Sequence, residues 1–157
     1  MSKIILITGK ICCGKTSYAA QLCADGRTVA LSCDELMLTL WPEGCGEAHD
    51  MYAERVKQYL LQKAAELCAA DLDVVLDWGP WTRAGRAEIC DYFRTRGIAC
   101  ELHHLAIPDT EWQRRIAKRN AAGTPGAYFV DEGLLQKFAE RYEVPSCDEA
   151  DVWLTNA

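Results

Sequence analysis

The sequence predicts an α/β fold in which a parallel β-sheet is covered by helices on both faces. Short apolar segments alternate along the chain with longer segments of helical periodicity, and this alternation is typical of parallel sheets. The length of 157 residues suits one domain with its own hydrophobic core, so we expect residues 1–157 to form a single domain. Five strands are expected, at residues 4–8, 28–32, 74–77, 100–106 and 151–154.

Five helices are expected between these strands. The first covers residues 15–24 and ends at Asp25 and Gly26, because glycine readily adopts the left-handed conformation that ends a helix. The longest covers residues 47–70, in which apolar side chains recur at the spacing of one helix face. The other three are expected at residues 82–96, 110–121 and 131–142.

Composition and charge narrow the class of function. A formal net charge of −6 disfavours broad binding to nucleic acid, which relies on Lys and Arg to neutralise phosphates. The nine cysteines follow no secretory signal and include no Cys-x-x-Cys pair, so we expect reduced thiols, a cytoplasmic location and no structural metal site. The apolar segments are far shorter than the ~20 residues that cross a bilayer. We therefore expect no membrane segment.

A phosphate-binding loop is indicated at residues 9–16, where Gly-Lys-Ile-Cys-Cys-Gly-Lys-Thr matches the P-loop pattern Gly-x-x-x-x-Gly-Lys-Ser/Thr. In this pattern, backbone N–H groups and the positive end of the following helix bind nucleotide phosphates. Lys15 is expected at the β and γ phosphates, and the Thr16 hydroxyl at a Mg²⁺ ion. An ordinary glycine-containing turn is the alternative interpretation. The predicted ligands are ATP and Mg²⁺. The predicted nucleotide-binding residues are Gly9, Lys10, Ile11, Cys12, Cys13, Gly14, Lys15, Thr16, Ser17 and, outside the loop, Arg119.

Two cysteines, Cys12 and Cys13, stand inside this loop. One interpretation is a redox role, for which the positive charge of Lys15 lowers the pKa of a neighbouring thiol. The alternative is that both are small residues at positions that tolerate any side chain.

Acidic residues follow the second and third expected strands, and in an open parallel sheet ligands bind where the strands end. Asp34 is interpreted as the catalytic base, which accepts the proton of the attacking acceptor hydroxyl. The alternative is that Asp34 only caps a helix that begins at Glu35. Asp77 is interpreted as a residue that orients the acceptor or holds Mg²⁺ through water, and a role in a turn is its alternative.

Aromatic and basic residues follow Asp77 directly. Trp78 and Trp81 are interpreted as rings that stack on a flat acceptor, with packing beneath the next helix as the alternative. Arg83 and Arg86 are interpreted as contacts to an acidic acceptor. A pair with Asp77, or plain surface exposure, is the alternative for these arginines.

A lid over the nucleotide is expected at about residues 110–130. Arg115 and Arg119 share one helix face there, and guanidinium groups over a transferring phosphate neutralise the charge that develops on it. A solvated basic face is the alternative. Glycine and proline at residues 123–126 interrupt the pattern, as suits a segment that moves.

With these residues, the chain resembles the P-loop kinase group of the AAA-type ATP-binding domains, which contains the phage polynucleotide kinase, zeta-toxin and chloramphenicol phosphotransferase families. The segments that carry the resemblance are residues 3–16, 32–35, 77–86 and 118–120. The resemblance implies a three-layer P-loop NTPase fold with strand order 2-3-1-4-5 for this chain. It also implies that Asp34 is the catalytic base, that Lys15 and Thr16 contact phosphate and metal, and that Arg119 is a lid residue.

The sequence therefore predicts a kinase that transfers the γ-phosphoryl group of ATP to a hydroxyl of a small-molecule or nucleoside/nucleotide acceptor. A polynucleotide end is disfavoured by the acidic net charge. Two alternatives belong to other classes: a nucleotide-binding switch or ATPase module without an acceptor, and a degenerate relative that binds a partner without turnover. The predicted catalytic residues are Lys15, Asp34, Arg115 and Arg119, and the predicted acceptor contacts are Asp34, Asp77, Trp78 and Arg83.

Overall fold

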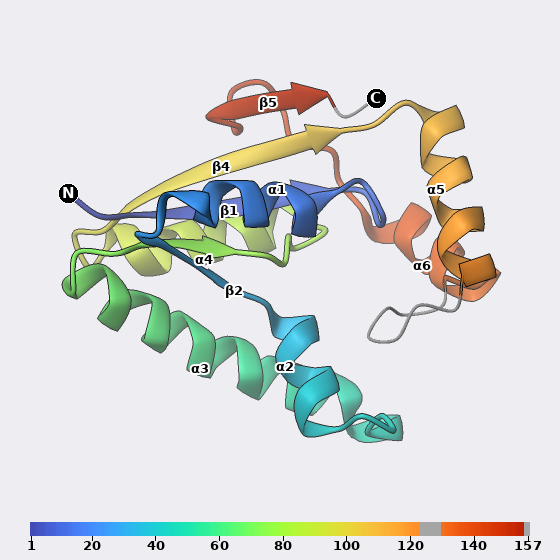
Figure 1. The fold of residues 1–157 in the computed structure, drawn as a ribbon, viewed down its shortest axis with the longest axis horizontal. Helices are drawn as coiled ribbons and strands as arrows, with labels where there is room; N and C mark the ends of the chain where they lie inside the picture. Colours follow the sequence, from blue (N-terminus) through green and yellow to red (C-terminus); the bar gives the residue numbers. More distant parts are fainter. Residues whose placement is uncertain (123–129, 156–157) are drawn as a thin grey trace.

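The computed structural model describes residues 1–122 and 130–155 and contains a five-stranded parallel sheet (Figure 1). The strands lie in the order β2-β3-β1-β4-β5, which confirms the predicted α/β class and strand order. Every observed strand overlaps its expected segment, and no strand end differs from the expectation by more than one residue. The strand bounds are β1 Lys3–Gly9, β2 Thr28–Leu31, β3 Asp73–Leu76, β4 Ala99–Ala106 and β5 Val152–Thr155.

Strand β1 lies at the centre of the sheet and is buried on both faces. Ile4 and Leu6 join the hydrophobic cluster on one face, and Ile5 and Ile7 join the cluster on the other. Side chains alternate between the faces of a strand, so a continuous apolar run is what a doubly covered strand requires. The run of residues 4–7 therefore places β1, and the loop that follows it, in the middle of the molecule.

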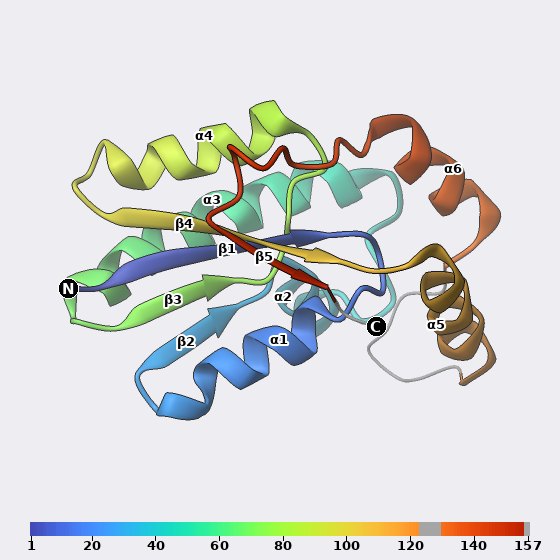
Figure 2. The ribbon, with the colours of Figure 1, turned by 90° about the horizontal axis from the view of Figure 1, so that it is seen from above.

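Helices cover both faces of this sheet and its carboxyl end. Helices α3 (His49–Ala69) and α4 (Arg83–Arg94) pack on one face, and α1 (Lys15–Leu22) packs on the other (Figure 2). Helices α5 (Asp109–Ala122) and α6 (Glu132–Arg141) lie beyond the carboxyl ends of the strands. All five expected helices are present, and Gly26 ends its short helical segment with a φ of 75°. The predicted break at residues 123–126 lies outside the described residues.

Helix α2 (Cys33–Leu40) is not among the five expected helices, and the sequence indicated it only through the possible cap at Asp34. It begins directly after β2, because the Ser32 side chain accepts a hydrogen bond from the Glu35 N–H at 3.2 Å and so caps the helix. Two 3₁₀ segments complete the described structure, η1 (Cys23–Asp25) and η2 (Gly46–Ala48). Among the described residues, no helix has both the length and the apolar character needed to cross a bilayer.

Candidate active site

The loop between β1 and α1 has the geometry of a phosphate cradle. Two of its residues have positive φ, Cys12 at 62° and Gly14 at 101°, so the chain turns sharply before the helix begins. Gly9 lies so close to its neighbours that an added Cβ would stand 2.5 Å from Cys13 Sγ and 2.7 Å from the carbonyl oxygen of Leu105. Glycine at position 9 is therefore required for the loop to pack against β4.

The amino end of α1 is open for an anion. Gly14 is its N-cap and supplies no side-chain hydrogen bond, and the first turn contains no acidic residue. The N–H groups at this end and the helix dipole therefore favour a negatively charged ligand. The Lys15 ammonium lies inside the loop, where it donates hydrogen bonds to the carbonyl oxygens of Gly9 at 3.2 Å and Lys10 at 3.1 Å. These features fit the polyphosphate of a nucleotide.

Thr16 and Asp77 meet at the carboxyl end of the sheet. The Thr16 hydroxyl donates a hydrogen bond to Asp77 Oδ2 at 3.0 Å, and the Asp77 N–H donates to the carbonyl oxygen of Leu31 at 2.9 Å. A hydroxyl beside a carboxylate is the kind of oxygen ligand set that Mg²⁺ uses together with phosphates and water. The two side chains therefore fit the predicted metal site.

Burial raises the pKa of Asp77 above its ordinary value of 3.8. The hydrogen bond from Thr16 and the charge of Lys15 oppose this effect, whereas the carboxylates of Asp34 and Glu35 add to it. A pKa raised by folding means that the folded protein holds the proton more tightly than the unfolded chain. The stabilisation that this gives is fully present below pH 3.8 and is lost as the pH rises through the folded-state pKa.

We therefore expect the ligand-free Asp77→Asn variant to be more stable than the wild type at pH 7. The amide accepts the Thr16 hydrogen bond without a buried charge, so its melting temperature should be higher. The difference should shrink as the pH falls toward 3.8, where Asp77 becomes protonated in the wild type. Thermal unfolding at several pH values tests this, with Asp91→Asn on the exposed side of α4 as the control. A lower melting temperature of Asp77→Asn at every pH would contradict the expectation.

Asp34 lies in the first turn of α2, exposed to solvent, and not at the N-cap. The interpretation of Asp34 as a cap is therefore wrong, because Ser32 performs that function. The Asp34 charge is close enough to Asp77 to raise the pKa of that carboxyl group. The structure thus brings Asp34 to the same edge of the sheet as Thr16 and Asp77.

Helix α5 is attached to the phosphate-binding loop by three side-chain contacts. Lys10 Nζ pairs with Asp109 Oδ1 at 2.8 Å, the Trp112 indole N–H donates to the carbonyl oxygen of Ile11, and Arg115 Nη1 donates to the carbonyl oxygen of Cys13 at 3.3 Å. Lys10 Nζ also stands 4.5 Å from the centre of the Trp112 ring. Asp109 and Trp112 were not among the predicted site residues, and no local pattern marks them, because about 100 residues separate them from the loop.

Arg115 contacts the loop, and the charges of Arg115 and Arg119 both act on Cys12 within it. Burial raises the pKa of the Cys12 thiol, and Arg119, Lys15 and Arg115 oppose this in that order. Arg115 thus lies beside the phosphate-binding backbone, and the predicted lid role of Arg115 and Arg119 stays a prediction. The same result corrects the interpretation of Cys12 as a thiol of lowered pKa, because the loss of hydration outweighs the nearby positive charges.

The residues that follow Asp77 are used for packing. Trp78 is 8% exposed and belongs to the hydrophobic core, and the Trp81 ring meets Phe138 edge-on at 5.2 Å. Both observations favour the packing alternative over stacking on an acceptor.

The two arginines at the start of α4 have separate environments. Arg86 is 1% exposed and pairs with Glu149 at 2.6 Å, so the expectation of an acceptor contact, or of a pair with Asp77, is wrong for Arg86. Arg86 also donates to the carbonyl oxygens of Pro80 and Trp81, which fixes the connection between β3 and α4. Arg83 is exposed and donates to Ser146 Oγ at 3.3 Å. Its predicted contact with the acceptor stays a prediction.

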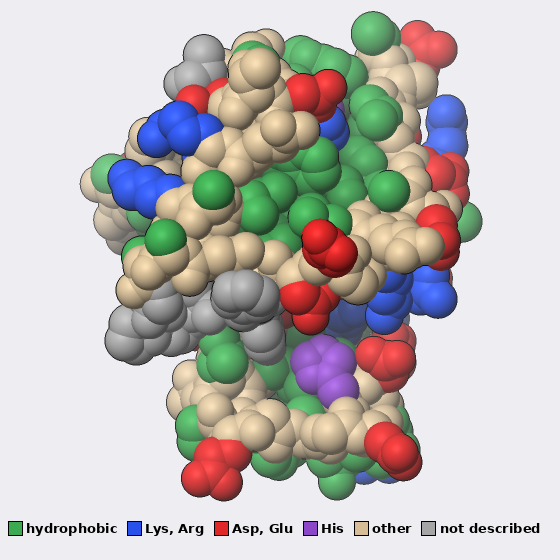
Figure 3. All heavy atoms as spheres, turned by 90° about the vertical axis from the view of Figure 1, so that its right-hand side faces the viewer, with side chains coloured by type: hydrophobic (Ala, Val, Ile, Leu, Met, Phe, Trp, Pro, Cys, Tyr) green, Lys and Arg blue, Asp and Glu red, His purple; other side chains and the backbone are tan. Residues whose placement is uncertain are grey.

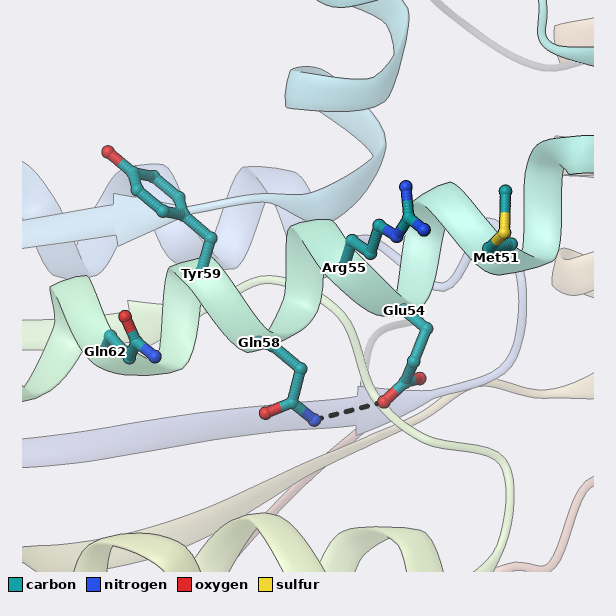
Figure 4. A pocket seen from close by; sticks show the side chains of 6 residues that line it. All are labelled: Met51, Glu54, Arg55, Gln58, Tyr59 and Gln62. Atoms are coloured by element: carbon teal, nitrogen blue, oxygen red, sulfur yellow. Dashed lines mark hydrogen bonds between the residues drawn. The ribbon is translucent and has the colours of Figure 1, made fainter.

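The face at the carboxyl ends of the strands has acidic side chains near its middle, beside a hydrophobic area (Figure 3). A cavity of about 260 Å³ lies at the carboxyl end of α2 and is lined by Met37, Leu38, Trp41 and the residues of the following loop. A second cavity of about 560 Å³ runs along α3 between Met51 and Gln62, where Glu54 accepts a hydrogen bond from Gln58 (Figure 4). Neither cavity is lined by any of the predicted site residues.

A family model described as an AAA domain matches residues 4–145, whereas no curated protein matches the sequence. Among solved structures, Kti12 from Chaetomium thermophilum in complex with ADP-AlF3 is similar, with a TM-score of 0.72, 16% identity and coverage of 98% of this chain and 88% of that one. The APS kinase CysC from Mycobacterium tuberculosis, in complex with AMPPNP and APS, has a TM-score of 0.62 at 21% identity over 98% and 88% of the two chains. A gluconokinase from Sinorhizobium meliloti has a TM-score of 0.65 at 16% identity over 99% and 83%.

Identities this low establish a shared fold and not a shared substrate. The match to the family model extends from β1 nearly to β5 and includes the phosphate-binding loop. The chain therefore belongs to this AAA domain family, and its fold is that of the P-loop kinases.

Proposed function

We propose that this protein is a magnesium-dependent kinase that transfers the γ-phosphoryl group of ATP to a hydroxyl of a small acceptor. The observation that carries the proposal is the convergence of four functional side chains at one edge of the sheet. Lys15 lies inside the phosphate-binding loop, Thr16 donates a hydrogen bond to Asp77, and the charge of Asp34, in the first turn of α2, raises the pKa of Asp77. A pure nucleotide sensor has no need of the second carboxylate.

Each of these groups has a defined task in phosphoryl transfer. Lys15 and the N–H groups of the loop bind the β and γ phosphates and neutralise charge as the terminal group leaves. Thr16 and Asp77 would hold Mg²⁺, which would supply positive charge to the phosphate groups. Asp34 accepts the proton of the acceptor hydroxyl as its oxygen attacks phosphorus. Arg115 and Arg119 approach from α5 and stabilise the equatorial oxygens of the transferring group.

The acceptor is proposed to be small. Asp34 and Leu38 are four residues apart on α2 and therefore lie on one side of the helix, and Leu38 lines the cavity of about 260 Å³. A compound bound in this cavity would therefore lie about one helical turn away from Asp34, the proposed base. The volume suits a small molecule or a nucleoside, and the net charge of −6 disfavours a polynucleotide end.

A transfer assay tests the proposal. The purified protein is incubated with Mg²⁺, ATP labelled in the γ-phosphate, and a panel of sugars, nucleosides, nucleotides and aromatic alcohols, and products are separated by chromatography. We expect label on at least one organic acceptor and much slower release of inorganic phosphate. Release of phosphate alone at the same rate with every acceptor would contradict the proposal and indicate an ATPase module instead.

A further inference from the structure

Two cysteine side chains meet inside the protein at the end of the sheet opposite to the phosphate-binding loop. Cys90 lies in the second half of α4, and Cys100 is the second residue of β4. Their sulfur atoms are 3.1 Å apart, with the Cys100 thiol donating a hydrogen bond to the Cys90 sulfur. Each residue is 6% exposed, and both belong to the hydrophobic cluster on the α3 and α4 face of the sheet.

The backbone holds the two sulfurs together from both sides. A short turn that includes Gly97 joins α4 to β4, and the Ile98 N–H donates to the carbonyl oxygen of Phe93 at 3.0 Å. Arg94, one helical turn after Cys90, donates to the carbonyl oxygen of Cys100 at 3.1 Å. A disulfide bond is about 2.05 Å long, so the sulfurs need to approach by only about 1 Å.

The two thiols differ in acidity. The hydrogen bond from Cys100 lowers the pKa of the Cys90 thiol; burial opposes this, and the Arg94 guanidinium adds to the lowering. The same hydrogen bond raises the pKa of Cys100, and burial raises it further. The proton therefore stays on Cys100, and the Cys90 sulfur is the better nucleophile of the two.

We propose that Cys90 and Cys100 are a modification site at which a small peroxide produces a reversible intramolecular disulfide. The Cys90 thiolate attacks one oxygen of hydrogen peroxide, the O–O bond breaks, and a sulfenic acid and hydroxide form. The Cys100 sulfur then attacks the Cys90 sulfur, and the S–OH bond breaks as the S–S bond forms. The hydroxyl group of the sulfenic acid leaves with the Cys100 proton as one water. The hydroxide from the first step takes the proton that Cys90 had lost and forms a second water. In total, the two thiols give two electrons to one peroxide, which becomes two waters.

The place of the proposed disulfide in the fold determines which properties of the protein it changes. Cys100 is at the amino end of β4, whereas Leu105, which pairs with Gly9 of β1, is near the carboxyl end of β4 (Figure 2). The disulfide connects α4 to β4 and reduces the freedom of the unfolded chain, which raises the melting temperature by about 5 °C. It should leave the affinity for magnesium and nucleotide unchanged, because it does not reach the loop.

Peptide mapping tests the proposal directly. Trypsin separates the two cysteines, because cleavage at arginine places Cys90 in residues 87–94 and Cys100 in residues 97–114. The native protein is treated with hydrogen peroxide, alkylated in denaturant and digested without reductant. We expect the two peptides to be linked to each other, and to separate after treatment with dithiothreitol.

Three variants and one internal reporter control the experiment. Cys90→Ser and Cys100→Ser should each lose the link and the rise in melting temperature. Cys68→Ser removes a thiol of the same cluster that is 7% exposed, and it should keep both. Cys147 is exposed and reports the dose of peroxide. If Cys147 is oxidised while Cys90 and Cys100 are recovered alkylated, or if either is linked to a different cysteine, the proposal is overturned.

Discussion

Replacement of Lys15 by methionine is expected to reduce kcat/KM for ATP on the order of 1,000-fold and to abolish measurable nucleotide binding. Methionine keeps the apolar stem and removes the ammonium that lies between the carbonyl oxygens of Gly9 and Lys10. Without that charge, only the N–H groups of the loop are left to bind the polyphosphate, and the repulsion between its negative charges is no longer balanced by the ammonium. Calorimetric titration with Mg²⁺ and a non-hydrolysable ATP analogue measures the binding, and a steady-state assay measures the turnover.

The matched control is Lys63→Met on α3. Lys63 is exposed and pairs with Glu66, three residues further along the same helix. A surface pair of this kind contributes little to stability, so the variant should bind nucleotide and turn over like the wild type. Nucleotide affinity in Lys15→Met equal to that of Lys63→Met would remove the basis of the nucleotide site.

Replacement of Asp34 by asparagine is expected to reduce kcat on the order of 1,000-fold while nucleotide affinity stays at the wild-type value. The carboxylate is proposed to take the proton from the acceptor hydroxyl, and an amide has no site for that proton. The phosphate-binding loop does not include Asp34, so the binding of ATP does not depend on it. Single-turnover transfer to the acceptor found in the panel, together with the nucleotide dissociation constant, separates the two effects.

Glu35→Gln provides a close control for Asp34→Asn. Asp34 and Glu35 are neighbours in the first turn of α2, so each substitution removes one negative charge from the positive end of the same helix. Both variants therefore lose a similar stabilisation from the helix dipole, about 0.3–1 kcal/mol. A kcat reduced equally in both variants would show an electrostatic effect on α2 and would contradict a role of Asp34 as base.

Much of the fold and of the phosphate site follows from short-range features of the sequence. The apolar run of residues 4–7 favours a strand buried on both faces, as observed, and the glycines at positions 9 and 14 permit the turn that follows it. These residues are neighbours along the chain, so their backbone geometry and hydrogen bonds depend mainly on local sequence. The prediction that Lys15 contacts phosphate and Thr16 contacts metal rests on this local pattern alone.

Local sequence did not settle the roles of Asp34, Trp78 and Arg86. A polar residue does cap α2, as the sequence rule for helix caps expects, but this residue is Ser32, two positions before Asp34. For Trp78 and Arg86 the sequence could not decide between cleft and core, because the same side chain suits either. The charge of the buried Arg86 is compensated by the carboxylate of Glu149, which lies 63 residues later in the chain.

The sequence by itself determined the order of strands and helices, the phosphate-binding loop and the acidic strand ends, because each depends on residues close together in the chain. Only the tertiary structure decided that α5 contacts the loop through Asp109, Trp112 and Arg115. It also decided that Asp77 accepts a hydrogen bond from the Thr16 hydroxyl and that the Cys90 and Cys100 sulfurs lie side by side. The reason is that a side chain's partner across the sheet is set by strand order and helix packing, which many distant residues fix jointly and no local pattern records.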